Sequence, residues 1–504
     1  MKLVAGVDSS TQSTKVLLVR ADDGTVAGAA AAPHPDGTEC HPDRWWEALS
    51  AAGRHLLERA DAVGVAAQQH GLVTVDEAGE AVRPALLWND VRSAPQAAEL
   101  VAELGGPDAW AARAGSVPTM SFTVTKLRWL AEREPGNAAR VSRVMLPHDW
   151  LTWRLAGGGP RRAGGADGAG GPDGAEGPDG AGGPDRAGGA GWLGAGRDPA
   201  AEPVTDRGDA SGTGYFSPAE GAWLPGYAER ALGRPVRLPR VAGPSEAVGR
   251  TAWGALLSAG TGDNMAAALG LELAAGDVAV SVGTSGTAYA VSGSAAADPL
   301  GLVCGFADAT GRFLPLACTL NAARVLDVTA RMLGVGADAL SDLALAAAAG
   351  AGGLVLLPYL DGERTPNRPA ANGVLRGLTT SNATPENLAR AAVEGVLCSL
   401  ADAVDCLRPC GISPARIVLT GGAARSAAVR AIAPAVFGLP VAVPEAAEYV
   451  ALGAARQAAW ALAGGAGPPS WPGRPSVTYE AAATPGVREQ YAALRDDAAA
   501  WQAG

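Results

Sequence analysis

An acid and an amide, Asp263 and Asn264, stand in the stretch AGTGDNMAAALG (259–270), between a glycine-rich turn and an alanine-rich run. A carboxylate in such a place can accept a proton from a substrate hydroxyl. It can instead cap a helix, because Asp side chains accept hydrogen bonds from the free N–H groups of the first turn. The local sequence favours the helix cap and leaves the role of general base open.

A second polar stretch, DSSTQSTK (8–15), follows a short apolar run. Small residues let backbone N–H groups approach an anion, and hydroxyl groups add further donors. Lys15 can pair with a terminal phosphate, and Asp8 can hold Mg²⁺ through its water shell. An ordinary Ser/Thr-rich hairpin turn is the alternative. The other candidate phosphate-binding residues of this turn are Thr11, Gln12 and Ser13.

Two later turns have a similar composition, SVGTSGTAY (281–289) and LTGGAARS (419–426). The first offers the same kinds of donor, whereas the glycines of the second let a ligand approach the backbone at a strand end. This second turn suits an adenosine pocket and plain helix–sheet packing equally well. Two hydroxyl-rich turns, one in each half of the chain, indicate a nucleotide phosphate held between two domains. No Walker-type glycine–lysine loop is present, so a P-loop enzyme is not expected.

Strands and helices alternate around these turns, which predicts an α/β protein. The opening run predicts two paired strands and a third strand after the turn at 22–24. Residues 277–293 repeat the theme of strand, polar turn and strand, so the two halves of the chain suggest an ancient duplication around a cleft. Further elements are expected from RWWEALSAAGRHLLERA as a helix, AVGVAAQQHGLVTVD as a strand running into a loop, and RIVLTGGAARSAAVRAIAPAVFG as strand, turn and helix.

Length and composition limit the classes of protein and partner. A chain of 504 residues is too long for one ordinary core and predicts two large domains. A formal charge of -11 argues against a nucleic-acid or acidic-membrane binder. Six cysteines without zinc-like or disulfide spacing favour a reduced, cytoplasmic protein, and the polar N-terminus does not resemble a signal peptide. The apolar stretch at 343–360 is interrupted by glycines and predicts a buried helix, a turn and a strand, with no membrane span.

Residues 157–200 repeat a Gly-Pro-Asp-Gly-Ala unit with almost nothing apolar to bury. Such a composition cannot offset the entropy lost on ordering, so a disordered insertion in one domain is expected. A neutral expansion of a surface loop is favoured over a role in recruiting a partner.

Together these motifs resemble the FGGY family of carbohydrate kinases, and within it most closely the xylulokinases. The resemblance covers nearly the whole chain except the insertion and the last few dozen residues. It implies an α/β fold of two ribonuclease-H-like domains, of the actin, sugar kinase and Hsp70 type, with the active site in the cleft between them. It implies a sugar-binding domain over 1–271 and a nucleotide-binding domain over 272–504. The resembling segments are GVDSSTQSTK, QQHGLVTVDEAGEAVRPALLWNDVRS, TDRGDASGT, GTGDNMAAALG, SVGTSGT, LPYLDGERTPNRPAANGVLRGLT and LTGGAARS.

The resemblance also implies the roles of individual residues. Asp263 is then the general base, and it holds the sugar together with Gln69, His70 and Asn264. Taken alone, His70 would be a structural histidine at a strand end. ATP and Mg²⁺ are the implied cofactors, with Asp8 on the metal. The implied nucleotide-binding residues are Thr11, Gln12, Ser13, Lys15, Gly283, Thr284, Ser285, Gly421, Gly422 and Ala423.

Trp88, Asn89 and Asp90 are expected to shape the same pocket, although packing would explain Trp88 equally well. The chain departs from many family members at two positions. Gln69 stands where they have methionine, and Ala423 stands where they have a third glycine.

The expected activity is the ATP-dependent phosphorylation of a pentulose, with D-xylulose as the expected acceptor. Asp263 is expected to be the first-turn acid of a helix, whose dipole keeps the pKa of the carboxyl low and the base ionised at neutral pH. Sugar and ATP are the expected partners, and a homodimer is compatible with the sequence. The alternatives are another FGGY sugar or polyol kinase, acting on ribulose or xylitol, and an actin-like ATPase or sugar sensor that transfers no phosphate.

Overall fold

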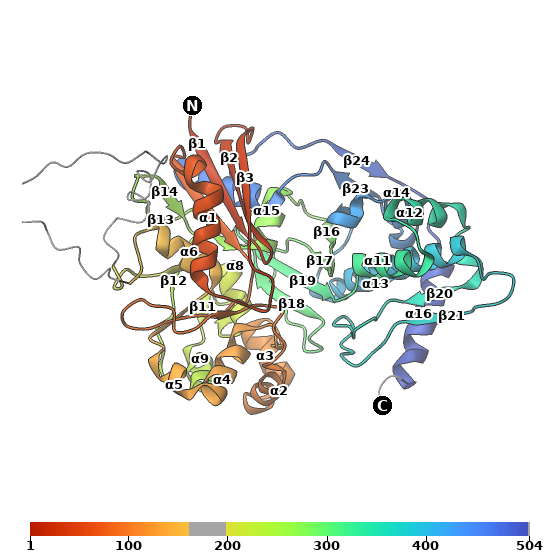
Figure 1. Ribbon diagram of the computed structural model, residues 1–504, viewed down its shortest axis with the longest axis horizontal. Helices are drawn as coiled ribbons and strands as arrows, with labels where there is room; N and C mark the ends of the chain where they lie inside the picture. Colours follow the sequence, from red (N-terminus) through yellow and green to blue (C-terminus); the bar gives the residue numbers. More distant parts are fainter. Residues whose placement is uncertain (161–197, 502–504) are drawn as a thin grey trace, which may run out of the picture.

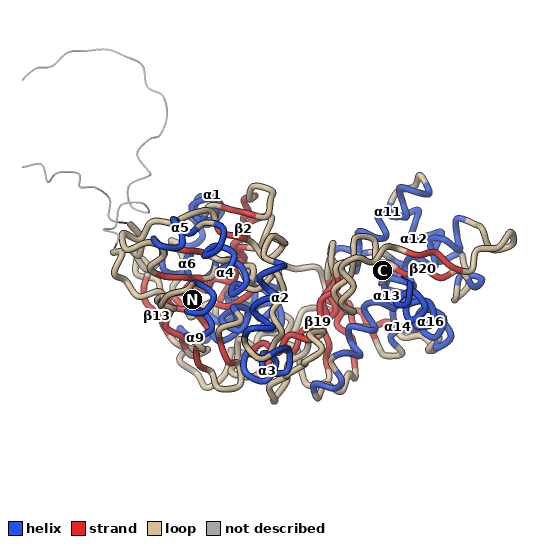
Figure 2. The backbone as a smooth tube through the Cα atoms, turned by 90° about the horizontal axis from the view of Figure 1, so that it is seen from below, coloured by secondary structure: helices blue, strands red, loops and turns tan. Residues whose placement is uncertain are grey.

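The computed structural model describes residues 1–160 and 198–501. It forms two α/β bodies side by side (Figures 1 and 2), each built around a seven-stranded sheet. The N-terminus lies on the first body and the C-terminus on the second. The predicted α/β fold with two domains is confirmed.

The first sheet has the strand order β13-β14-β5-β1-β2-β3, with β15 added to β5. Strands β1, β2 and β3 are antiparallel neighbours, whereas β5 is parallel to β1 and β14 is parallel to β5. The predicted opening hairpin is therefore present. The strands are β1 (Leu3–Ser9), β2 (Ser13–Arg20), β3 (Val26–Pro33), β5 (Ala62–Ala67), β13 (Ala247–Arg250), β14 (Leu256–Ser258) and β15 (Thr261–Gly262).

The second sheet repeats this arrangement in the order β18-β19-β17-β16-β22-β23-β24. An antiparallel β16–β17 hairpin again leads into parallel neighbours, β22 beside β16 and β23 beside β22. The shared topology is the ribonuclease-H-like arrangement that the sequence predicted. The strands are β16 (Asp277–Val282), β17 (Gly286–Tyr289), β18 (Val303–Ala307), β19 (Phe313–Thr319), β22 (Arg416–Thr420), β23 (Val441–Pro444) and β24 (Ser476–Tyr479).

Helices cover both sheets, and short strands connect them. The helices up to the middle of the chain are α1 (Pro42–Leu57), α2 (Ala94–Glu103), α3 (Gly106–Ala114), α4 (Thr123–Arg133), α5 (Pro135–Arg140), α6 (Pro147–Leu155), α8 (Arg207–Ala210), α9 (Pro225–Leu232) and α10 (Asp263–Gly270). The later helices are α11 (Ala323–Leu333), α12 (Ala337–Ala346), α13 (Pro385–Cys406), α14 (Ala427–Phe437), α15 (Tyr449–Ala463) and α16 (Pro485–Trp501). The short strands are β4 (Glu39–Cys40), β6 (Val73–Val75), β7 (Ala85–Leu86), β8 (Arg143–Met145), β9 (Val204–Asp206), β10 (Phe216–Ser217), β11 (Ala222–Trp223), β12 (Arg240–Ala242), β20 (Val355–Leu357) and β21 (Val374–Arg376).

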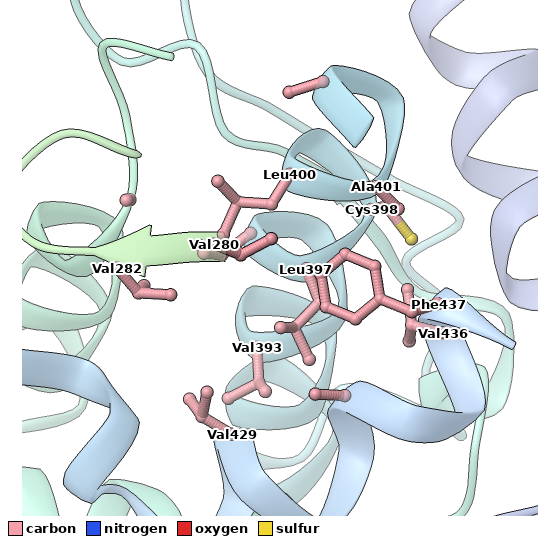
Figure 3. Packing of buried hydrophobic residues seen from close by; sticks show 14 of the residues in the cluster. Val280, Val282, Val393, Leu397, Cys398, Leu400, Ala401, Val429, Val436 and Phe437 are labelled. Atoms are coloured by element: carbon pink, nitrogen blue, oxygen red, sulfur yellow. The ribbon is translucent and has the colours of Figure 1, made fainter. Parts of the chain in front are cut away.

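The core of the second body forms around α13. This helix is buried along most of its length and packs against β16 and α14, as Figure 3 shows for Val280, Leu397 and Phe437. Apolar residues dominate α13 on more than one face, so the helix is stable only when sheet and helices cover it on several sides. The apolar stretch at 343–360 contributes to this body as the end of α12, a glycine turn and β20, which confirms the predicted elements.

Helix α15 lies late in the chain but packs on the first sheet (Figure 1). A Cβ atom on Gly6 of β1 would lie 1.8 Å from the carbonyl oxygen of Ala451, and one on Gly64 of β5 would lie 2.2 Å from that of Ala454. Glycine is therefore needed at both strand positions. The division of the chain at residue 271 remains a prediction, because α15 follows that position and yet covers the first sheet.

Helices α10 and α15 cross at a distance that only glycine permits. A Cβ atom on Gly453 would lie 1.8 Å from the carbonyl oxygen of Ala266, and one on Gly270 would lie 2.1 Å from that of Tyr449. The two helices therefore touch backbone to backbone. Since α10 begins with Asp263, this crossing determines where that carboxylate lies.

The repetitive insertion falls mainly on residues 161–197, outside the described residues, and so does its predicted disorder. Its described ends are joined, because Asp198 donates its backbone N–H to the carbonyl oxygen of Gly157 at 3.0 Å. Among the described residues, no helix is long and apolar enough to cross a membrane. The six cysteines are all free.

We predict that Gly453→Ala destabilises the protein by at least about 2 kcal/mol, because the added methyl group overlaps the backbone of α10. Gly136→Ala is the matched control, since this helical glycine has nothing within 4 Å of the added atom. The control is expected to be neutral or slightly stabilising. Urea unfolding of both variants measures the difference, and equal midpoints would contradict the prediction.

Candidate active site

A cavity of about 270 Å³ lies where the two bodies meet, and we call it the inner cavity. Both halves of the chain line it, as a cleft site requires. The residues from the first half are Thr11, Gln69, His70, Trp88, Ser121, Asp263 and Asn264. Those from the second half are Ser281, Gly283, Thr284, Ser285, Thr287, Cys304, Phe306, Leu316, Cys318 and Arg364.

Asp263 lies at the wall of the inner cavity as the first residue of α10. Its Oδ1 accepts hydrogen bonds from the backbone N–H of Asn264 at 2.8 Å and from Asn264 Nδ2 at 3.0 Å. Gly262 occupies the N-cap position, and no side chain caps the helix. The predicted cap role of Asp263 is therefore wrong: the residue lies one position later, where its carboxylate binds only the neighbouring amide groups.

The expected low pKa of Asp263 is also wrong. Burial, with the negative charges of Asp8 and Asp209, raises the pKa of Asp263 to about 7. A helix of eight residues offers only a partial positive charge at its start. The loss of water around the carboxylate and the two nearby acids outweigh that contribution.

Gln69 and His70 lie beside Asp263, on the loop that follows β5. Gln69 Oε1 accepts a hydrogen bond from Asn264 Nδ2 at 3.0 Å, and its buried Nε2 has no hydrogen-bond partner among the described residues. This amide orientation follows from Asn264, whose NH₂ group also faces the acceptor oxygen of Asp263. Gln69 therefore lines the cavity and holds a buried donor without a partner among the described residues.

His70 is held rigidly in a left-handed backbone conformation with φ of 67°. Its Nδ1 lies 2.7 Å from the carbonyl oxygen of Gly212 and must carry the proton, since a carbonyl only accepts. Its own carbonyl oxygen accepts hydrogen bonds from Lys126 Nζ at 2.9 Å and Thr123 Oγ1 at 3.2 Å. Burial lowers the pKa of His70 to about 3, so the ring is neutral and its Nε2 is an acceptor at the cavity.

The three residues predicted to shape the pocket, 88–90, do not all line the inner cavity. Trp88 lines the inner cavity and donates from Nε1 to Thr11 Oγ1 at 2.8 Å. Asp90 lies away from the described cavity lining and is buried, where it accepts hydrogen bonds from Thr38 and Arg92. Asn89 also lies outside the cavity lining and donates to the carbonyl oxygen of Gly37. The structure therefore brings only Trp88 to the cavity.

Asp8 stands near the end of β1 and is almost completely buried. Its carboxylate accepts a short hydrogen bond from Ser10 Oγ, and burial raises its pKa to about 6. Its charge also acts on Asp263. Neither Asp8 nor Asp263 forms an ion pair with a described residue, so the two carboxylates form an oxygen-rich corner that suits Mg²⁺.

The turn with Gly283, Thr284 and Ser285 connects β16 to β17 and lines the inner cavity opposite Asp263. Thr11 lies at the same cavity through its contact with Trp88. Gln12 and Ser13, by contrast, line neither the inner cavity nor the larger cavity around Lys15 and Gly422. The carbonyl oxygen of Gln12 accepts the N–H of His34, and Ser13 pairs with Pro33 as the first residue of β2.

A second cavity of about 730 Å³, which we call the outer cavity, lies at the end of β22, the strand that pairs with β16. Thr420 lines it and is the β22 partner of Ser281, which lines the inner cavity. Lys15 reaches the outer cavity from the first body and forms an ion pair of 2.6 Å with Glu448. It is therefore paired with a carboxylate that a phosphate would have to displace.

Two of the three small residues of the last turn line the outer cavity, Gly421 and Gly422. A Cβ atom on Gly421, with φ of 89°, would lie 2.7 Å from the backbone of Val282, so packing alone explains this glycine. Ala423 lies outside the described cavity lining and packs against the core of the second body.

Comparison with known proteins agrees with this geometry. The family model described as "FGGY family of carbohydrate kinases, N-terminal domain" matches residues 3–162, and the model for the C-terminal domain matches residues 278–462. The chain belongs to the FGGY family of carbohydrate kinases. Its two ribonuclease-H-like bodies and the cleft between them are the fold of that family.

Several FGGY relatives are xylulose kinases. The xylulose kinase of Streptomyces coelicolor is 46% identical over 479 residues, which cover 92% of this chain and 88% of the relative. That of Streptomyces rubiginosus is 44% identical over 92% of this chain and 88% of the relative. The crystal structure of xylulose kinase from Bifidobacterium adolescentis superimposes with a TM-score of 0.86, at 41% identity, and covers 98% of this chain and 99% of that chain.

The sequence predicted no role for several residues that line the inner cavity, most notably Arg364. Its motif LPYLDGERTP belongs to the family resemblance, so the motif was the signal, but the sequence did not show which of its side chains reaches the cavity. Ser121 and Phe306 carry no comparable motif. They reach the cavity only because the loop before α4 and strand β18 meet there.

We predict that kcat/KM for the sugar falls as the pH drops through about 7, because a base must be ionised to accept a proton. Below this pKa the loss should approach tenfold per pH unit. Steady-state rates between about pH 8 and pH 5.5 measure the acid limb. A profile that stays flat down to about pH 5 would agree with the low pKa first expected for Asp263 and contradict the raised one.

We predict that Asp263→Asn lowers kcat by about 10²- to 10⁴-fold without destabilising the protein. The pKa of Asp263 rises from 3.8 in the unfolded chain to about 7 in the folded chain, so the protein loses stability as the pH increases between these two values, and Asn avoids this loss. The Tm of the variant should therefore equal or exceed that of the unchanged protein at about pH 8, and this advantage should disappear at low pH. Near-normal activity would show that Asp263 has only a structural role.

Proposed function

We propose that this protein transfers the γ-phosphoryl group of Mg-ATP to the terminal hydroxyl group of a pentulose, with D-xylulose as the substrate. The observation that carries the proposal is the inner cavity, where a carboxylate and three polar side chains face a Gly/Thr/Ser turn from the other body. The size of this cavity, about 270 Å³, suits one small sugar. The similarity to xylulose kinases over nine-tenths of the chain supports the same substrate.

Asp263 is the proposed general base. A sugar hydroxyl is weakly acidic, so a carboxylate within hydrogen-bond reach must take its proton as the new O–P bond forms. Asn264 holds that carboxylate with two hydrogen bonds. Gln69 Nε2 is a free donor and His70 Nε2 a free acceptor, so the two groups bind sugar oxygens and hydroxyl protons respectively.

ATP is the proposed phosphoryl donor, with its adenosine in the outer cavity and its phosphates towards the turn 283–285. Gly422 and Lys15 line the outer cavity and would hold the nucleotide there. The carboxylate of Asp8 fits Mg²⁺, which would neutralise charge on the phosphate oxygens when bound. Thr11 lines the inner cavity together with this turn, whereas Gln12, Ser13 and Ala423 remain predictions that no contact supports.

Other FGGY activities are the nearest alternatives, since a ribulose or polyol kinase would use the same base. The buried, unpaired donor of Gln69 favours a transferase over an ATPase without a sugar substrate, because a buried N–H without a partner is costly. The cytoplasmic location and the homodimer remain predictions.

The activity is tested by incubating the protein with Mg-ATP and a panel of pentuloses, hexuloses and polyols while ADP release is followed. We expect release that depends on D-xylulose, at a rate well above that without sugar, because closure of the cleft on a bound sugar completes the reaction centre and excludes water. Equal ADP release with every sugar and without sugar would contradict the kinase function. If another sugar alone is active, the substrate assignment is wrong and the reaction type is retained.

A further inference from the structure

Arg364 reaches the inner cavity from a loop that is held firmly on both sides. The carboxylate of Glu363 accepts hydrogen bonds from the N–H groups of Leu320 at 2.5 Å and of Arg364 at 2.8 Å. Thr365 Oγ1 donates to the carbonyl oxygen of Cys318 at 2.8 Å. The backbone that carries the guanidinium group is therefore fixed before any ligand binds.

The guanidinium group itself has few partners. Its one hydrogen bond with a described residue runs from Nη2 to Cys304 Sγ at 3.4 Å, and sulfur is a weak acceptor. No carboxylate among the described residues lies within ion-pair distance of it. The other nearby cation, Lys126, already donates to the backbone carbonyls of His70 and Ser121. Among the described residues that line this cavity, Arg364 is therefore the cationic side chain that has free hydrogen-bond donors.

A series of contacts links Arg364 to the base, and no direct contact between the two is present among the described residues. Asp263 contacts Asn264, which contacts Gln69, and His70 follows in the chain. The ring of His70 lies 5.8 Å from that of Phe306, and Cys304 stands two residues before Phe306 on the same face of β18. Cys304 then contacts Arg364. The guanidinium group and the base therefore line one cavity with several residues between them, so a single sugar can contact both.

The chemistry of a 2-pentulose matches this separation. Its terminal hydroxyl group at C5 closes the furanose ring, so that hydroxyl is free to attack phosphorus only in the open-chain form. The open chain has a ketone at C2, three bonds along the carbon skeleton from C5. A ketone oxygen only accepts hydrogen bonds, whereas a guanidinium group only donates them. An alditol has at C2 a hydroxyl group, which can accept the same hydrogen bond but finds no acceptor for its own proton at a guanidinium group.

We infer that Arg364 is a specificity-determining residue that binds the C2 ketone oxygen of an open-chain ketose while Asp263 faces the hydroxyl at the other end. The inference rests on the proposed kinase function and narrows its substrate class to ketoses over alditols. It also means that a bound sugar touches both bodies of the protein, Asp263 from the first and Arg364 from the second.

The test compares kcat/KM for D-xylulose, D-ribulose and xylitol in the unchanged protein and in Arg364→Met, at saturating Mg-ATP. We expect the variant to lose about 10- to 100-fold for both ketoses and a clearly smaller factor for xylitol, because a ketone oxygen is fully satisfied by a donor-only group, whereas the C2 hydroxyl of xylitol gains no acceptor for its own proton there. The KM for ATP should not change. If xylitol is not turned over, its inhibition constant against D-xylulose replaces its kcat/KM.

Two further variants control for folding and charge. Arg376→Met removes an exposed arginine on β21 that pairs with Asp497, and it should leave all three rates unchanged. Arg364→Lys keeps the charge but not the planar fork, so its ketose preference should fall between those of the other two proteins. It serves as the test if Arg364→Met does not fold, as judged by its Tm.

An unchanged ratio of ketose to alditol efficiency in the Arg364 variants would overturn the inference, even if both efficiencies fell together. In that case activity of the unchanged protein on D-xylulose would leave the proposed function standing. If the unchanged protein is inactive on every sugar, the proposed function is refuted, and so is the role of Arg364.

Discussion

The crossing of α10 and α15 is the contact on which the rest of the structure depends. Gly270 and Gly453 let the two helices meet backbone to backbone, and Gly6 and Gly64 let α15 lie equally close to the first sheet. No side chain separates these elements, so none of them can shift without a clash. A helix from the end of the second half thereby becomes part of the first half, and the base at the start of α10 acquires a fixed position. The contact therefore fixes the wall of the cleft on which Asp263 lies.

This fixed position has an electrostatic consequence. Burial raises the pKa of both Asp263 and Asp8, and the negative charges of Asp8 and Asp209 raise that of Asp263 further. In the ligand-free protein this corner therefore holds protons more tightly than exposed carboxylates would. A divalent cation at Asp8 would relieve the repulsion and favour the ionised base. Assembly of the proposed reaction centre and the charge state of the base are thus coupled.

Much of the fold and part of the site could be predicted from the sequence. The hairpins after Lys2 and Gly276, the helices α1 and α14, and the repeated halves follow from apolar periodicity and turn residues. The placement of Gln69, His70, Asp263 and Asn264 at one cavity followed from family motifs. The sequence could not place Gln12, Asn89 or Asp90, because a motif identifies a loop without showing which side chains of that loop face the ligand.

Local sequence determined that Asp263 begins a helix after a glycine turn, since helix starts depend on neighbouring residues along the chain. Tertiary structure alone decided its charge state. The acids that raise its pKa come from β1 and α8, far away in sequence, and burial by the second body removes the water that would have screened them. The same holds for Arg364, whose motif is visible in the chain but whose distance from the base depends on how the two sheets meet. Short-range interactions are encoded in adjacent residues, whereas desolvation and charge repulsion arise only when distant segments pack together.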